Sequence, residues 1–281
     1  MKTLIAYFSA EGTTAKIAIY EGKSMKKQED SDHFLKVTEC YYSRILGTSD
    51  NLFAHNYLKP FFFYTPIRNT PLQGYEHRFD LLAIQTEQGI IISYGDAVLT
   101  EIPKLEMALD SDTVSLHEAI SRILKKEPRH SYKYYFSGRI PKGFSARPLN
   151  ASDYSAFETF FLLSNANMED KSWLREYFHE MIREGLCTGV FVNNVLVSCS
   201  DSPTVPFMKD SVREIGINTL ERYRRQGYAK DACSCAIQEI LKQGKCPIWS
   251  TGSDNLPSQR LAEALGFRLF GEMFSISMDN V

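Results

Sequence analysis

The stretch that decides the fold runs from Glu214 to Ala229 and reads Glu-Ile-Gly-Ile-Asn-Thr-Leu-Glu-Arg-Tyr-Arg-Arg-Gln-Gly-Tyr-Ala. Its first half completes a strand predicted over residues 212–219. Its end opens a helix, because apolar residues recur at helical spacing from Ala229 to Leu241. Strand, loop and helix therefore follow one another in one short segment, with a glycine just before the helix.

Gly227 lies where the chain turns into this helix, and the turn has the properties of an anion site. A glycine adopts left-handed backbone easily and lets the main chain approach a ligand closely. The first N–H groups of a helix lack intrahelical acceptors and lie at the positive end of its dipole. Arg224 and Arg225 add charge that can pair with phosphate oxygens. The segment predicts a diphosphate site, against the alternative of a solvated basic helix start.

A second segment supports this interpretation. Residues 247–251 predict another strand after the helix. The chain then reads Asn-Leu-Pro-Ser-Gln-Arg-Leu-Ala-Glu-Ala-Leu-Gly-Phe from Asn255 to Phe267. This predicts a short helix over residues 259–265 that ends at Gly266.

Together the two segments resemble the signatures of the GNAT superfamily of N-acetyltransferases. Arg224 to Ala229 fits the pyrophosphate pattern Arg/Gln-x-x-Gly-x-Gly/Ala, and Asn255 to Phe267 is similar to the second signature. The resemblance covers roughly Gly143 to Val281, about half of the chain. It is closest to the group with an extra N-terminal α/β domain. It implies a GNAT acyltransferase fold and acetyl transfer from acetyl-CoA to a primary amine by direct attack.

The resemblance also implies a binding mode for acetyl-CoA. Two central parallel strands, residues 212–219 and 247–251, would separate and admit the pantetheine arm between them. Backbone groups of Ile217, Asn218 and Thr219 would bond the pantetheine amides and polarise the acetyl carbonyl. The residues expected at the remaining part of the cofactor are Arg224, Arg225, Gln226, Gly227, Tyr228, Ala229, Asn255 and Ser258.

Glu214 is the candidate general base, because some GNAT enzymes place a catalytic glutamate near this strand position. A carboxylate in a partly dry cleft can have its pKa raised into a useful range. The alternative is a strand glutamate paired with a neighbouring arginine. The family's usual acid is a tyrosine in the last helix, but this sequence has Ala262 there. Another group or water would then protonate the thiolate; Tyr223, Tyr228 and Cys199 are weaker candidates.

Composition excludes several other classes of protein. The 281 residues carry a formal net charge of −2, so the basic footprint of a nucleic-acid-binding protein is absent. No apolar run approaches the length of a membrane span. The six cysteines form no CxxC pair and the histidines no HxxxH spacing, so we expect free thiols in a reducing cytoplasm and no metal site.

The first residues form a separate unit. Residues 1–18 resemble the first strand and FMN-phosphate loop of flavodoxins, and a charged linker follows over residues 21–32. The rest of a flavodoxin is absent, so we expect no FMN and interpret residues 1–24 as a fusion remnant or start-site artefact, with Met25 as the original start. The expected division is residues 1–24, a smaller mixed α/β domain over residues 25–140, and a GNAT domain over residues 141–281.

Short-range signals predict several further elements. Strands over residues 81–84 and 89–94 would form a hairpin, and Ser115 would cap a helix. Asn193 and Asn194 would form the turn of a second hairpin. Residues 268–278 read as two strand-like pieces.

Three functions remain open from the sequence. The first is the acetyltransferase, the second a non-catalytic acyl-CoA-binding regulatory module, and the third an FMN-binding flavodoxin-like electron carrier. The acceptor would be a small-molecule amine or a peptide N-terminus. Nothing in the sequence identifies it, or the oligomeric state.

Overall fold

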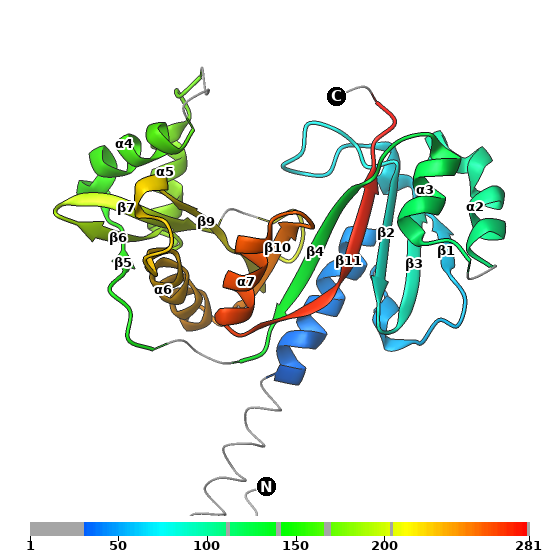
Figure 1. Cartoon of the computed structure of the whole chain (residues 1–281), viewed down its shortest axis with the longest axis horizontal. Helices are drawn as coiled ribbons and strands as arrows, with labels where there is room; N and C mark the ends of the chain where they lie inside the picture. The colour runs from blue at the N-terminus through cyan, green and yellow to red at the C-terminus, as the bar shows by residue number, and fades with distance from the viewer. Residues whose placement is uncertain (1–30, 111–112, 139–141, 166–169, 203–204, 280–281) are drawn as a thin grey trace, which may run out of the picture.

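The computed structural model describes residues 31–110, 113–138, 142–165, 170–202 and 205–279. The flavodoxin-like segment expected over residues 1–24 lies outside them. Helices and strands mix in two sheets, so the predicted mixed α/β class is confirmed. Figure 1 shows the smaller sheet on the left and the larger sheet on the right, with β10 and α7 near the middle.

The elements have the following bounds. The larger sheet contains β1 (Phe61–Tyr64), β2 (Leu81–Thr86), β3 (Gly89–Tyr94), β4 (Arg129–Phe136), β8 (Val212–Glu214), β10 (Cys246–Gly252) and β11 (Phe267–Ile276). The smaller sheet contains β5 (Arg147–Pro148), β6 (Thr188–Val192), β7 (Val195–Asp201) and β9 (Gly216–Thr219). The helices are α2 (Ile102–Leu109), α3 (Leu116–Leu124), α4 (Tyr154–Ser164), α5 (Leu174–Arg183), α6 (Tyr228–Lys242) and α7 (Leu256–Ala264), and residues 31–46 are also helical.

The larger sheet has the strand order β1-β3-β2-β11-β4-β10-β8. The outer pairs β1–β3 and β10–β8 are parallel, and the pairs between them are antiparallel. Successive side chains of a strand point to opposite faces. Leu81 and Ala83 accordingly pack with α2 and α3, while Leu82 and Ile84 pack with the helical segment 31–46. Helices therefore cover both faces of the sheet.

The smaller sheet has the order β5-β6-β7-β9 and is antiparallel throughout. Val190, Val197 and Ala232 form a cluster between this sheet and α6. Phe157 of α4 and Phe178 of α5 belong to the main core cluster, with ring centroids 4.7 Å apart. The sheet thus carries α6 and the α4–α5 pair, and it positions the start of α6 beside β9.

Both predicted hairpins and the Ser115 cap are confirmed. β2 and β3 pair in register, and Gly89 after the turn has φ 120°. Asn193 and Asn194, between β6 and β7, have φ of 49° and 63°, which asparagine tolerates. The Ser115 hydroxyl accepts the Glu118 N–H at 3.2 Å and begins α3.

The chain end differs from the expectation of two strand-like pieces. Residues 267–276 form one long strand, β11, with an irregularity in its register between Leu269 and Gly271. β11 pairs with β2 on one side and with β4 on the other, and β4 also pairs with β10. The sheet therefore crosses the boundary expected at residue 140. A unit of residues 141–281 alone would lack β4, and the division into domains stays a prediction.

Candidate active site

The strand predicted over residues 212–219 is divided between the two sheets. β8 runs parallel to β10, whereas β9 runs antiparallel to β7. At the junction the Ile215 N–H donates to the Ile248 carbonyl at 3.1 Å. Beyond this bond the two halves belong to different sheets, so β9 and β10 diverge. The prediction of one continuous strand was wrong, because the run of β-forming residues gives no local signal for the break.

The backbone of β9 presents alternate groups to the side away from β7. The Leu220 N–H donates to the Val197 carbonyl of β7. Because the main-chain groups of successive strand residues point alternately toward and away from the partner strand, those of Ile217 and Thr219 point away from β7. The Thr219 N–H is already bonded to Asn218 Oδ1 (3.0 Å), and the Thr219 carbonyl accepts from Arg224 Nε (3.2 Å). Asn218 pairs with Cys199 in the ladder. Of the three residues expected to bond pantetheine, Ile217 is the one whose main chain faces the gap without a bond inside the described chain.

The loop before α6 has the backbone that an anion site requires. Arg225 has φ 61° and Gly227 has φ 89°, both in the left-handed region. Gly227 is the residue immediately before α6, so the first N–H groups of the helix, including those of Tyr228 and Ala229, have no intrahelical acceptor. A Cβ added at Gly227 would meet no atom within 4 Å. Glycine is therefore favoured at this position by its left-handed backbone conformation and not by a lack of space for a side chain.

The side chains of this loop are partly engaged within the protein. Arg224 ties the loop to β9 through Thr219, and Gln226 Nε2 donates to the Arg222 carbonyl at 3.2 Å. Arg225 is exposed, and no hydrogen bond of its side chain occurs among the described residues. The loop is thus held in shape by Arg224 and Gln226, while Arg225 stays available for a phosphate.

Asn255 and Ser258 have structural bonds in α7. The Asn255 side chain caps the helix by accepting the Ser258 N–H at 3.2 Å, and Ser258 Oγ accepts from Trp249 Nε1 at 3.1 Å. Asn255 thus caps α7, and Ser258 ties the helix to Trp249 of β10. Their predicted contact with a cofactor stays a prediction.

No acid stands at the family's usual tyrosine position. Ala262 is fully buried in the main core cluster. Cys199 is buried as well, and its contact with the Cys187 sulfur, with burial, raises the pKa of its thiol. Tyr223 and Tyr228 pack near each other with ring centroids 6.4 Å apart. Both tyrosine rings pack against the cluster of Val190, Val197 and Ala232 under α6.

A cavity of about 100 Å³, here called the inner cavity, lies beside Glu214. Its polar lining consists of Tyr41, Tyr42, Tyr75, Ser131, Lys133, Glu214, Ser250 and Ser275. Burial raises the pKa of Glu214, and the charge of Lys133 opposes that shift. Burial lowers the pKa of Lys133, whose Nζ donates to Ser250 Oγ at 2.6 Å. A carboxylate with a raised pKa and a single facing cation is an arrangement suited to proton transfer.

Sequence reasoning missed the partners of Glu214. Lys133 comes from β4, and the tyrosines come from the helical segment 31–46 and the loop before β2. All lie far from Glu214 in sequence and carry no motif. The strand pairing of β4 with β10, which sets Lys133 opposite Ser250, brings them together.

A second carboxylate, half-buried by its exposed surface, lies near the strand break. Asp201 ends β7 opposite Gly216, and its carboxylate fills the space that a Cβ on Gly216 would need. Tyr177 of α5 donates to Asp201 Oδ2 at 2.5 Å. Burial raises the pKa of Asp201, and the Tyr177 hydrogen bond lowers it. Asp201 was not among the candidate residues that the sequence indicated.

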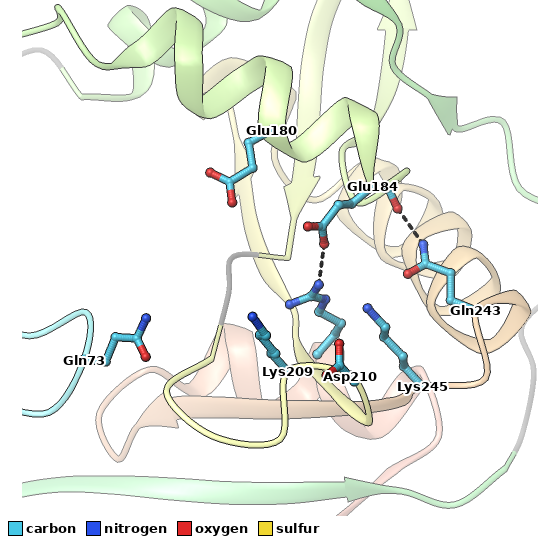
Figure 2. A pocket seen from close by; sticks show the side chains of 8 residues that line it. Gln73, Glu180, Glu184, Lys209, Asp210, Gln243 and Lys245 are labelled. Carbon is cyan, nitrogen blue, oxygen red and sulfur yellow. Dashed lines mark hydrogen bonds and ion pairs between the residues drawn. The ribbon is translucent and has the colours of Figure 1, made fainter.

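A larger space of about 730 Å³, here called the outer pocket, lies at the free edge of β8. Its lining consists of Gln73, Glu180, Glu184, Lys209, Asp210, Arg213, Gln243 and Lys245. Figure 2 shows Lys209 and Lys245 projecting toward the α5 side that carries Glu180 and Glu184. Arg213 forms its ion pair with Glu184 and not with Glu214, the next residue in the sequence. Glu214 instead lines the inner cavity.

Comparison with known proteins fits this geometry. The family model of the GNAT acetyltransferases matches residues 100–273, and the chain therefore belongs to the GNAT acetyltransferase family. No curated protein sequence matches the chain. The matched range begins before α2 and includes β4, the strand that carries Lys133.

Several solved structures of GNAT proteins are similar to part of the chain at low sequence identity. A GNAT acetyltransferase from Colwellia psychrerythraea is 20% identical over 53% of this chain and 56% of its own, with a TM-score of 0.44. A protein of the GNAT family from Novosphingobium aromaticivorans is 20% identical over 53% and 63%, with a TM-score of 0.43. A GCN5-related N-acetyltransferase from Sphaerobacter thermophilus is 11% identical over 58% and 57%, with a TM-score of 0.46. The match thus spans less than two thirds of each of these relatives.

The described residues lack two features that would indicate other classes of protein. None of their helices is both long enough and apolar enough to span a bilayer. Among the same residues, no group of three or more histidine, cysteine or acidic side chains is arranged to hold a metal ion.

Proposed function

We propose that this protein transfers an acetyl group from acetyl-CoA to a primary amine. The observation that carries the proposal is the left-handed loop at Arg225 and Gly227, placed between β9 and the first turn of α6, where β9 diverges from β10. Unpaired N–H groups at a helix start favour a diphosphate. The diverging strands leave room for an extended arm that bonds the Ile217 main chain.

In the proposed reaction, Glu214 accepts a proton from the acceptor amine. The amine nitrogen attacks the thioester carbonyl, and the resulting oxyanion is stabilised by the Ile217 N–H of β9. The carbon–sulfur bond then breaks, releasing the amide and the CoA thiolate. The thiolate takes its proton from water, because Ala262 offers none, and Glu214 returns the proton that it took from the amine to water, so the protons balance. Catalysis then rests mainly on Glu214 and on holding the two reactants in place.

The two sequence-based alternatives have less support. A non-catalytic acyl-CoA-binding module would have no use for a buried carboxylate facing a lysine in a cavity. An FMN carrier rests on residues 1–18, which lie outside the described chain. We also propose a cytoplasmic location, because all six cysteines are free thiols, as a reducing compartment keeps them.

Acetyl-CoA should stabilise the folded protein, whereas FMN should not. A ligand that binds the native state alone adds about 2.7 kcal/mol at a hundredfold excess over its dissociation constant. A thermal-shift assay with acetyl-CoA, desulfo-CoA and FMN checks this. Stabilisation by FMN without stabilisation by acetyl-CoA would overturn the proposed donor.

Lys133→Met should move the acid limb of the pH–rate profile to higher pH. The Lys133 cation lowers the pKa of Glu214, and its loss lets the burial-raised pKa rise further. Since a general base acts as the carboxylate, activity then appears at higher pH. Lys133→Arg keeps the charge and is the control. An unshifted limb in the methionine variant, in a folded protein, would mean that Lys133 does not act on the base.

A further inference from the structure

The outer pocket contains charged groups of both signs that the protein itself leaves unpaired. Its lining has three cationic and three anionic side chains, and the other two are amides. Arg213 and Glu184 form the one ion pair between lining residues in the described chain. Lys209, Lys245, Glu180 and Asp210 form none there. No side chain of this lining is apolar, so the pocket is unsuited to a hydrophobic ligand.

Arg213 lies at the floor of this pocket and is incompletely satisfied. The residue is 3% exposed, and Nη2 bonds Glu184. Nε and Nη1 are buried and have no hydrogen-bond partner among the described residues. Buried donors are almost always bonded, and a charged donor left without an acceptor is costly. Because Nε and Nη1 are closed off from the pocket and Nη2 is paired with Glu184, an anionic group of a ligand would find its counter-charge in Lys209 and Lys245.

The outer pocket and the inner cavity border the same two segments. Arg213 and Glu214 are consecutive residues of β8. Arg213 lines the outer pocket, and Glu214 lines the inner cavity. The loop before β2 contributes Gln73 to the outer pocket and Tyr75 to the inner cavity. Because water occupies about 30 Å³ per molecule, the inner cavity holds about three heavy atoms, enough for an aminomethyl end. The body of such an acceptor has to lie elsewhere.

We infer that the outer pocket binds the body of the acceptor, and that the acceptor is a zwitterionic primary amine. The anionic group of the acceptor lies between Lys209 and Lys245 above Arg213. A cationic group faces Glu180 and Asp210. The reacting amine extends past the edge of β8 to Glu214. This inference rests on the proposed acetyl transfer and adds the class of acceptor to it.

Three probes with the same aminoalkyl end test the class. L-Lysine carries a zwitterionic body, 1,5-diaminopentane a cationic one, and pentylamine an apolar one. With acetyl-CoA saturating, kcat/KM should be at least tenfold higher for lysine than for either of the others. Equal values for all three would overturn the inference and leave the proposed function standing. Absence of turnover with every amine would contradict the proposed function itself.

Charge reversal in the pocket separates recognition from chemistry. Lys245→Glu should raise KM for lysine about tenfold, leave its kcat unchanged, and leave the kinetics with pentylamine unchanged. Lys242→Glu is the matched control, because Lys242 lies three residues earlier, outside the lining, and pairs with Glu239. Arg213 stays intact because it is buried. If Lys245→Glu has no effect, or changes the kinetics with lysine and pentylamine equally, the outer pocket does not bind the acceptor.

Discussion

Glu214→Gln should lower kcat by about 100- to 10,000-fold, the usual contribution of general acid–base catalysis. Glutamine keeps the size of the side chain and cannot accept a proton at the relevant pH. The affinity for acetyl-CoA should be unchanged, since the loop before α6 is intact. Steady-state kinetics at saturating acetyl-CoA, with binding measured by calorimetry, would show both.

Asp201→Asn is the matched comparison for this loss. Asp201 is the other half-buried carboxylate near the strand break, and it is bonded to Tyr177. If Glu214 is the base, Asp201→Asn should retain most of the kcat. The reverse result, with a large loss in Asp201→Asn and little in Glu214→Gln, would assign the base to Asp201. The residual activity of Glu214→Gln should rise with pH, because a larger share of the amine is then unprotonated.

Gly227→Asp should reduce the affinity for acetyl-CoA by at least a hundredfold. Two like charges 4 Å apart repel by about 4 kcal/mol at an effective dielectric constant of 20, and salt reduces this at an exposed loop. That is up to about a thousandfold in Kd. Calorimetric titration with acetyl-CoA measures the loss directly, and a melting curve reports the fold.

Gly227→Asn controls for backbone strain. Gly227 has φ 89°, so any side chain there adds strain, of about 1–2 kcal/mol. Asparagine has nearly the shape of aspartate and tolerates the left-handed region, but it carries no charge. The asparagine variant should therefore bind acetyl-CoA much better than the aspartate variant. Equal affinity in the two variants, or unchanged affinity in Gly227→Asp, would show that the loop does not meet a diphosphate.

The parts of the fold with local causes were predictable from sequence. Asn193 and Asn194 predict a hairpin turn, and Ser115 predicts a helix start, because their side chains favour the backbone conformations found there. The loop at Gly227 belongs to the same group. In each case a few neighbouring residues determine the structure.

The parts that depend on distant pairing were not predictable. Lys133 meets Ser250 because β4 enters the sheet beside β10, and no neighbouring residue signals that pairing. The break at Ile215 depends on two different partner strands competing for one run of residues. The candidate base was found from its own strand position. Its cavity required tyrosines, a lysine and a loop that the sequence keeps apart.

The position of β11 also has a consequence for synthesis on the ribosome. β2 and β4 are both completed more than a hundred residues before β11 emerges, yet β11 is the strand that joins them. Until then both strands expose an unpaired edge, which invites pairing with other chains. Contacts of such long sequence separation also slow folding. A nascent chain of this protein would therefore depend on protection by chaperones until its last strand is available.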